Sequence, residues 1–191
     1  MTQPIIPTHL AFILDGNRRW AKMRGKPTFF GHKKGIEGVK NVLSHAQKLG
    51  IKIITVYRFS TENWNRSKKE VEYLMKLFGS FIDRHIPNLH KQNVRLNHLG
   101  EISRLPKTLQ KKIKQAMDLT KNNEKLIFNI ALNYGGRDEI VRTVKKIINQ
   151  GYKAKDITAD LINKNLDTAG LPDPEMIIRT SGEQRLSGFL P

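Results

Sequence analysis

The chain has 191 residues, of which 38% are hydrophobic and 27% charged, so it is long enough to enclose a core and is not a disordered polypeptide. It contains no cysteine, which excludes disulfides, thiolate zinc sites and a cysteine nucleophile, and makes a reducing cytoplasm the expected location. An excess of 34 Lys and Arg over 17 Asp and Glu gives a net charge of +17, which raises nucleic acids, anionic membranes and phosphorylated substrates as partners.

Apolar segments rich in β-branched residues alternate along the chain with segments of helical periodicity. Taken in order, the pattern predicts a strand over 9–14, a helix over 35–49, a strand over 51–59, a long helix over 68–90, a strand over 94–99, a helix over 107–120, a strand over 126–132, a helix over 138–149 and a short strand over 176–178. Strands alternating with helices of this length need crossover connections, so we expect an α/β fold with a mostly parallel sheet flanked by helices. No repeat or linker divides the sequence, and a single domain over 1–191 is predicted.

Polar segments follow four of the predicted strands, at residues 15–20, 60–66, 133–137 and 179–185. In an open parallel sheet, ligands bind beyond the carboxyl ends of the strands. We therefore expect these four segments, distant in the sequence, to meet on one rim of the sheet.

The content of these segments indicates a pocket for phosphate or diphosphate. A single carboxylate at a strand end, Asp15, suits Mg²⁺, which keeps most of its waters and bridges to substrate phosphate. Arginines offer rigid forks that match phosphate oxygens, and Gly16 lets the backbone approach an anion closely. One such segment would more often be a capped turn or a surface salt bridge, but four at corresponding strand ends favour a functional site.

Several other classes of protein lose support because their motifs are missing. The sequence has no GxxxxGK(S/T), GxGxxG or HExxH motif, and no Asp-Asp-x-x-Asp run of the kind that marks trans-prenyl synthases. The lysines are spread along the whole chain and form no basic arm, so we interpret most of the charge as solvated surface and expect no nucleic-acid partner.

Five motifs in order resemble the cis-prenyltransferases of the undecaprenyl diphosphate synthase type. They are Phe-Ile-Leu-Asp-Gly-Asn-Arg-Arg-Trp-Ala over 12–21, Gly-His-Lys over 31–33, Phe-Ser-Thr-Glu-Asn-Trp over 59–64, Asn-Tyr-Gly-Gly-Arg over 133–137 and Ile-Arg-Thr-Ser-Gly-Glu over 178–183. Each motif alone is weak, but five in the family's order and spacing across essentially all 191 residues are highly specific.

This resemblance implies the sequential cis-condensation of isopentenyl diphosphate onto an allylic diphosphate such as farnesyl diphosphate. The product would be a long-chain polyprenyl diphosphate, the precursor of a lipid carrier for cell-wall glycan synthesis. Mg²⁺ would be the cofactor, and the full-length protein would be a cytoplasmic homodimer that touches the membrane only through its product. The long helix over 68–90 would form one wall of an apolar tunnel for the growing chain, although a plain core helix would show the same pattern.

The resemblance also implies roles for individual residues. Asp15 would bind Mg²⁺ and promote departure of the allylic diphosphate, and Asn63 would assist proton removal. Residues of the allylic diphosphate site and the condensation point would be Gly16, Asn17, Arg18, Arg19, Trp20, His32, Ser60, Thr61, Glu62, Trp64 and Arg66. Residues of the isopentenyl diphosphate site would be Arg179, Arg185, Leu186 and Ser187.

The chain departs from the family pattern at three places. Thr28 stands where the family usually has Arg, and Arg58 stands where it usually has Ala. We expect Arg58 either to find a carboxylate or to turn toward phosphate, and its replacement by Ala to lengthen the products. The family continues beyond Pro191 through a last strand, an acidic metal ligand and much of the dimer contact, so a chain ending there is expected to lack its last strand, to be poorly soluble or loosely folded, and to bind Mg²⁺–diphosphate weakly. An inactive fragment, a non-catalytic subunit of a prenyltransferase and, with less support, a basic nucleic-acid-binding protein are the alternatives.

Overall fold

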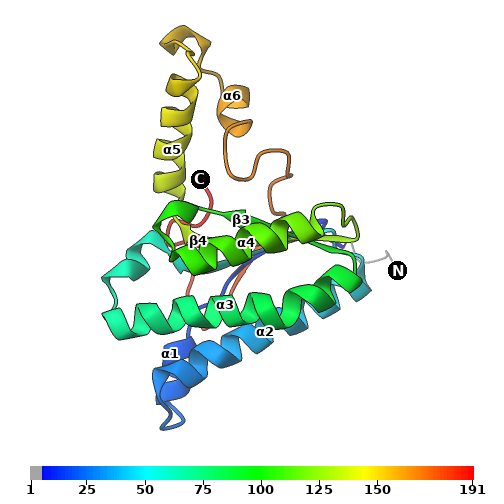
Figure 1. Ribbon diagram of the computed structural model, residues 1–191, viewed down its shortest axis with the longest axis vertical. Coiled ribbons are helices and arrows are strands. Elements are labelled where there is room, and N and C mark those ends of the chain that lie inside the picture. The colour runs from blue at the N-terminus through cyan, green and yellow to red at the C-terminus, as the bar shows by residue number, and fades with distance from the viewer. Residues whose placement is uncertain (1–5) are drawn as a thin grey trace.

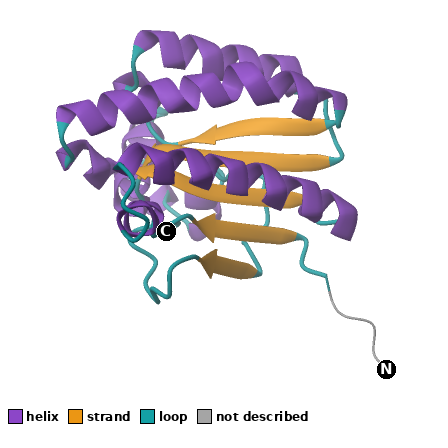
Figure 2. Cartoon of the chain, turned by 90° about the horizontal axis from the view of Figure 1, so that it is seen from below, coloured by secondary structure: helices purple, strands orange, loops and turns teal. Residues whose placement is uncertain are grey.

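Five parallel strands form the sheet of the computed structural model, which describes residues 6–191. The strands are β1 (His9–Ile13), β2 (Ile53–Ser60), β3 (Val94–Leu99), β4 (Leu126–Tyr134) and β5 (Met176–Arg179). They pair in the order β3-β4-β2-β1-β5, and their arrowheads point the same way in Figure 2. The predicted parallel α/β fold is therefore confirmed, and the carboxyl ends of β1, β2 and β5 lie at one edge.

The helices connect these strands in the expected alternation. They are α1 (Asn17–Lys22), α2 (Thr28–Leu49), α3 (Lys68–Lys91), α4 (Lys107–Thr120), α5 (Gly136–Asn149) and α6 (Ala159–Asn163), with short 3-10 helices η1 (Thr61–Asn65), η2 (Ile102–Arg104) and η3 (Ala154–Asp156). Two differences from the sequence expectation bear on the site. The helix predicted over 35–49 begins at Thr28, and the unpredicted helix α1 packs against its first turns.

The main core lies between the sheet and the helices α2, α3 and α4 (Figure 1). Alternate residues of the central strands point into it, and α3 contributes one apolar side, including Leu74, Phe78 and Ile82. Burying each such side chain contributes about 1.5–3 kcal/mol. The long helix begins at a defined residue because the Ser67 hydroxyl accepts the Glu70 N–H.

A smaller apolar cluster covers the opposite face of the sheet. Its centre is Phe189, which is fully buried, stacks on the Tyr57 ring at 4.8 Å and meets the edge of Tyr134. Helix α5 extends away from the body of the molecule, as Figure 1 shows. Among residues 6–191, no helix has both the length and the hydrophobicity that a bilayer crossing requires.

The pairing of β2 with β4 is irregular at the end that faces the polar segments. Tyr57 pairs with Ala131, but Phe59 pairs with Leu132 and Ser60 with Tyr134, so Arg58 is an extra residue on β2 and Asn133 an extra residue on β4. Asn133 has a φ of 52°, in the left-handed region that Asn tolerates. Bulges of this kind change the direction of side chains next to functional sites.

Candidate active site

Asp15 and Arg179 meet at the ends of two neighbouring strands. Arg179 Nη2 donates to Asp15 Oδ2 at 2.7 Å, and the Gly16 N–H donates to Oδ1 at 2.6 Å. Partial burial raises the pKa of Asp15, but the hydrogen bonds from Arg179 and Gly16 lower it more, so the pKa lies below its ordinary value. The carboxylate is therefore charged at neutral pH.

The turn after Asp15 is tightly packed against the turn after β5. Gly16 has a φ of 82°, and a Cβ on it would overlap the Ser181 side chain. The next turn is fixed by Arg19, whose guanidinium donates to Glu183 Oε1 at 2.7 Å and to Ser181 Oγ at 2.6 Å. The predicted allylic site and the predicted isopentenyl site are thus joined through side-chain contacts.

A second group of charges surrounds Glu70, in the first turn of α3. Glu70 Oε1 accepts from Arg66 at 2.9 Å and from His32 Nε2 at 3.2 Å, and Arg18 Nε lies 3.9 Å away. Burial raises the pKa of Glu70, but the hydrogen bonds from His32 and Arg66 lower it more. Burial also lowers the pKa of His32, which the bond to Glu70 only partly offsets, so His32 is a neutral donor.

A cavity of about 380 Å³ joins these two groups at the carboxyl end of the sheet. Its lining consists of Leu14, Asp15, Gly16, Asn17, Arg18, Arg19, His32, Arg58, Arg66 and Leu74. Six of the sequence-predicted substrate or metal residues from the first two motifs therefore meet here, together with Arg66, which lies two residues after the third motif. We call this space the cationic cavity.

A larger cavity of about 800 Å³ lies on the other side of the Asp15–Asn17 segment. Trp20 lines it, with Met23 and Arg24, and the Arg24 guanidinium lies 4.5 Å from the Trp20 ring centroid. Thr180 and Ser181 border it from the β5 side. Trp20 therefore faces this second cavity and is not part of the lining of the cationic cavity.

The segment after β2 folds into η1 and is held by its own polar groups. Asn63 Oδ1 accepts the Ser60 N–H at 3.2 Å, and the Ser60 side chain caps the Asn63 N–H in return. Trp64 Nε1 donates to Asn133 Oδ1 at 2.7 Å, which ties η1 to the bulge of β4. Thr61 lies beside Gly135, and Glu62 is exposed. These residues flank the cationic cavity and do not line it.

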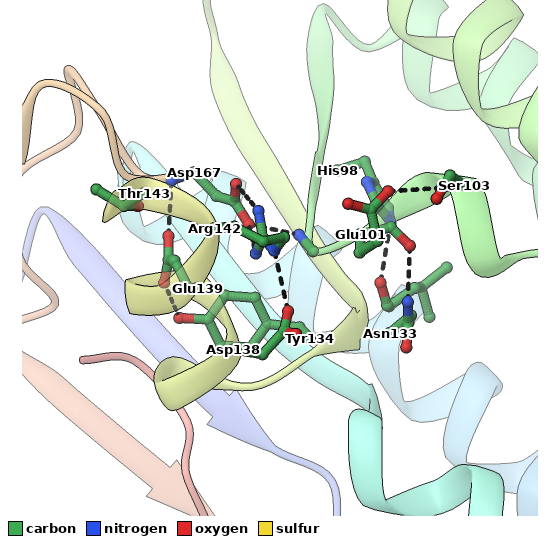
Figure 3. A network of polar contacts seen from close by, with 12 residues as sticks. His98, Glu101, Ser103, Asn133, Tyr134, Asp138, Glu139, Arg142, Thr143 and Asp167 are labelled. Carbon is green, nitrogen blue, oxygen red and sulfur yellow. Dashed lines mark hydrogen bonds and ion pairs between the residues drawn. The ribbon is translucent and has the colours of Figure 1, made fainter. Parts of the chain in front are cut away.

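The segment after β4 is anchored by a polar network, shown in Figure 3, and faces away from the cationic cavity. Tyr134 Oη donates to Glu139, whose other oxygen accepts the Asp167 N–H at 2.6 Å. Arg142 then makes paired hydrogen bonds to Asp167 at 2.7 and 2.8 Å. Burial raises the pKa of Glu139, and the hydrogen bond that Tyr134 donates offsets this only in part. The segment after β4 therefore stabilises the fold next to the candidate site.

The remaining predicted residues lie in the last turn of the chain. Arg179 Nη1 donates to Ser187 Oγ at 2.9 Å and to the Arg185 carbonyl, so Arg179 orders this segment. The Arg185 guanidinium pairs with Glu183, and Leu186 is exposed. None of these three residues lines the two cavities, although the loop that carries them adjoins the Asp15–Arg179 pair.

Sequence reasoning missed two residues, one that organises the charges beside the cationic cavity and one that anchors the last turn of the chain. Glu70 is the common acceptor for His32, Arg66 and Arg18, and its only sequence signal is the Ser-x-x-Glu capping box at residues 67–70. Phe189 holds the last turn against the sheet, and an aromatic residue near the end of a chain gives no such signal.

Comparison with known proteins places the chain in a family. A family model described as "Putative undecaprenyl diphosphate synthase" matches residues 13–191. An isoprenyl transferase of Streptococcus pneumoniae is 50% identical over 194 residues, covering 97% of this chain and 77% of that protein. An isoprenyl transferase of Clostridium tetani is 44% identical over 189 residues, covering 97% of this chain and 74% of that protein.

Solved structures agree with these matches. Lavandulyl diphosphate synthase from Lavandula x intermedia, in complex with dimethylallyl diphosphate, superposes with a TM-score of 0.92 at 37% identity, covering 97% of this chain and 82% of the other. A "probable undecaprenyl diphosphate synthase" from Campylobacter jejuni gives a TM-score of 0.78 at 30% identity, covering 96% of this chain and 79% of the other.

The parallel sheet, the cationic cavity at its carboxyl edge and these relatives together define an enzyme that transfers prenyl groups. The chain belongs to the undecaprenyl diphosphate synthase family of prenyltransferases.

Proposed function

We propose that this chain catalyses the sequential cis-condensation of isopentenyl diphosphate with an allylic diphosphate such as farnesyl diphosphate, giving a long-chain polyprenyl diphosphate. The observation that carries the proposal is the cationic cavity, in which Asp15 and four arginines converge from the segment after β1, α1, β2 and the segment before α3. A relative that holds dimethylallyl diphosphate supports a prenyl diphosphate as the ligand.

Asp15 is the residue that would hold Mg²⁺. Within residues 6–191, no three His, Cys, Asp or Glu side chains gather into a metal cluster, so the chain offers one carboxylate at this place. That donor fits Mg²⁺, which takes one or two carboxylates and completes its shell with water and substrate phosphate. Each Asp15 oxygen accepts one hydrogen bond and keeps a lone pair. When bound, Mg²⁺ neutralises negative charge on the phosphate oxygens.

The arginines of the cavity would stabilise the departing diphosphate. In the first step the C1–O bond of the allylic substrate breaks, and negative charge grows on the leaving diphosphate. Arg18 is 60% exposed on its side chain and loosely paired with Glu70, so it can turn toward phosphate at little cost. Gly16 and Asn17 border the same space and let the diphosphate approach the backbone.

Condensation would join the substrates held at the two predicted sites. A bond forms between C4 of isopentenyl diphosphate and C1 of the allylic group, and a proton leaves C2 as the new cis double bond forms. We assign the isopentenyl diphosphate to Arg179, Arg185, Leu186 and Ser187, and the assistance of proton removal to Asn63. The hydrogen bond between Arg179 and Asp15 supports this assignment, because two diphosphates bound at these residues would lie next to each other.

The remaining parts of the proposal concern the product and the assembly. The apolar side of α3 would form a wall of the path taken by the growing chain. We propose a cytoplasmic enzyme that contacts the membrane through its product, a precursor of the lipid carrier for cell-wall glycans. We propose that it acts as a homodimer.

The test is incorporation of radiolabelled isopentenyl diphosphate onto farnesyl diphosphate with Mg²⁺ present. We expect extended prenyl diphosphates from the wild-type chain and a rate about 10²–10³-fold lower for Asp15→Ala, because charge stabilisation at the leaving group is lost. The folded state of Asp15→Ala is checked by circular dichroism. A chain that binds farnesyl diphosphate without extending it would be a non-catalytic member, and an Asp15→Ala variant within a few-fold of wild type would exclude Asp15 as the metal ligand.

A further inference from the structure

Arg58 is a largely buried cation that has no acidic partner among the described residues. Its Nε is inaccessible to solvent and makes no hydrogen bond, and Nη2 makes one long bond of 3.3 Å to the His32 carbonyl. Among residues 6–191 no carboxylate forms an ion pair with it. The cation Arg66 lies near it. Burial, together with the charge of Arg66, lowers the pKa of Arg58 to about 10, so Arg58 is still protonated at neutral pH.

The β2 bulge determines where this side chain points. Arg58 is the extra residue between Tyr57 and Phe59, so it does not follow the regular alternation of the strand. It lies on the helical side of the sheet, with the guanidinium 5.8 Å from the Phe78 ring centroid and in contact with α2 through His32. The face of the sheet that packs against the main core thus carries a positive charge near the carboxyl end of β2.

Arg58 lines the cationic cavity on one side and a very small apolar cavity on the other. The apolar cavity is bounded by Ile36, Val39, Val56, Phe78, Phe81, Phe128 and Ile130. The guanidinium therefore stands at the floor of the cationic cavity, where polar lining gives way to core. The acids bordering this cavity already have partners: Asp15 pairs with Arg179, and Glu70 pairs with Arg66 and His32.

We infer that Arg58 is a further binding residue for the allylic diphosphate, contacting its phosphate oxygens from the floor of the cationic cavity. The inference rests on the proposed function, because it assigns the ligand of the same cavity. A buried donor without a partner costs free energy, and an apolar side chain of equal volume would pack better against Phe78 and Val56. A diphosphate in the cavity would supply the missing acceptor and offset the charge.

The experiment compares Arg58→Met with wild type, using inorganic pyrophosphate with Mg²⁺ as the probe in calorimetric titrations. Met keeps most of the volume and removes the charge. We expect affinity for pyrophosphate to fall about 10- to 100-fold, since charge-assisted hydrogen bonds are lost. Without ligand, the melting temperature should rise by about 2–6 °C, because an unsatisfied buried cation is removed. Arg95→Met is the matched control. Arg95 is exposed on β3, an edge strand of the sheet, and its replacement should change neither value.

Kinetics identify the substrate concerned. In the condensation assay Arg58→Met should raise KM for the allylic diphosphate and leave KM for isopentenyl diphosphate unchanged. Equal pyrophosphate affinity in wild type and Arg58→Met would overturn the inference about Arg58 and leave the proposed function standing. A rise confined to KM for isopentenyl diphosphate would overturn the assignment to the allylic substrate. If wild type itself bound no pyrophosphate, both the proposed function of the cavity and this inference would fail.

Discussion

Single residues of this site are arranged as charges that pair with one another. Asp15 pairs with Arg179, Arg19 with Glu183, and Glu70 with Arg66 and His32. Such pairs fix side-chain positions at small net cost, because each desolvated charge keeps a partner. They also make the cavity dependent on a few acids, among them Glu70, which contacts the basic side chains of Arg18, His32 and Arg66.

Replacing Glu70 with Gln tests this dependence. The folded-state pKa of Glu70 is depressed, so its contribution to stability is fully present above the unfolded pKa and is lost as pH falls through the folded pKa. We expect Glu70→Gln to lower the free energy of unfolding by about 1–2 kcal/mol near neutral pH, through weaker bonds to Arg66 and His32. The difference from wild type should shrink as pH falls below the ordinary glutamate pKa and through the depressed folded-state pKa, where the wild-type carboxyl takes up its proton.

Urea denaturation at several pH values measures this effect. Glu72→Gln is a matched control, because Glu72 lies in the same helix and forms no ion pair within the described part of the chain. A Glu70→Gln difference that stayed constant from neutral to acid pH would show that packing, and not the charge, accounts for the loss.

The sequence predicted the residues of this site better than it predicted their contacts. Asp15 and Arg179 could be placed together because the ends of parallel strands meet at one edge, and the structure joins them at 2.7 Å. Glu70 could not be found in this way, since its neighbours come from α1, α2 and the segment before α3. The spacing of residues along the sequence does not predict which helices pack together. Arg58 was expected to seek a carboxylate or a phosphate, and the bulge that directs it has no sequence signature.

At the level of elements, the strands were predicted closely and the start of α2 was wrong. Each strand is a short β-branched run with polar flanks, which is a strong local signal. The segment over 28–34 was not assigned to a helix, and its Gly31, like Gly35 just after it, weakens helix propensity. The structure shows the reason for the glycines: a Cβ on Gly31 would overlap the carbonyl oxygen of Asn17, and one on Gly35 would press on the Asn17 side chain.

This close approach of α1 to α2 can be tested with a pair of Gly→Ala variants in the same helix. Gly31→Ala should force α1 away, destabilise the fold by about 1–3 kcal/mol and weaken pyrophosphate binding, because Asn17 and Gly16 move with α1. Gly38 has open space where a Cβ would stand, so Gly38→Ala should stabilise the chain by about 0.5–1 kcal/mol through helix propensity.

Chemical denaturation measures both free energies, and calorimetry measures pyrophosphate affinity for Gly31→Ala. Because the two variants add the same methyl group to the same helix, any difference reflects the contact with α1. Equal stability of the two proteins would mean that α1 does not depend on the glycine at position 31 for its position against α2.

The molecule as a whole has two compact faces and one protruding helix. The sheet with α2, α3 and α4 encloses the main core, whereas α5 extends away from that body (Figure 1). Four apolar residues of α5 are exposed, namely Ile140, Val141, Val144 and Ile148. Their spacing of one, four and eight places them on one side of the helix. An uncovered apolar stripe of this kind favours association with another surface.

We expect this stripe to mediate self-association of the chain, in line with the proposed homodimer. Val141 and Ile148 are 51% and 61% exposed, so a Val141→Lys and Ile148→Lys double variant removes apolar area without disturbing the core. Sedimentation velocity should show a concentration-dependent dimer or larger species for wild type and a monomer for the double variant, because two charges would have to be desolvated at the contact.

Leu119→Lys is the matched control: Leu119 is 49% exposed on α4, away from the stripe, and its replacement should leave the association unchanged. A wild-type chain that remained monomeric at high concentration, or a double variant that associated as strongly as wild type, would show that α5 is not the contact.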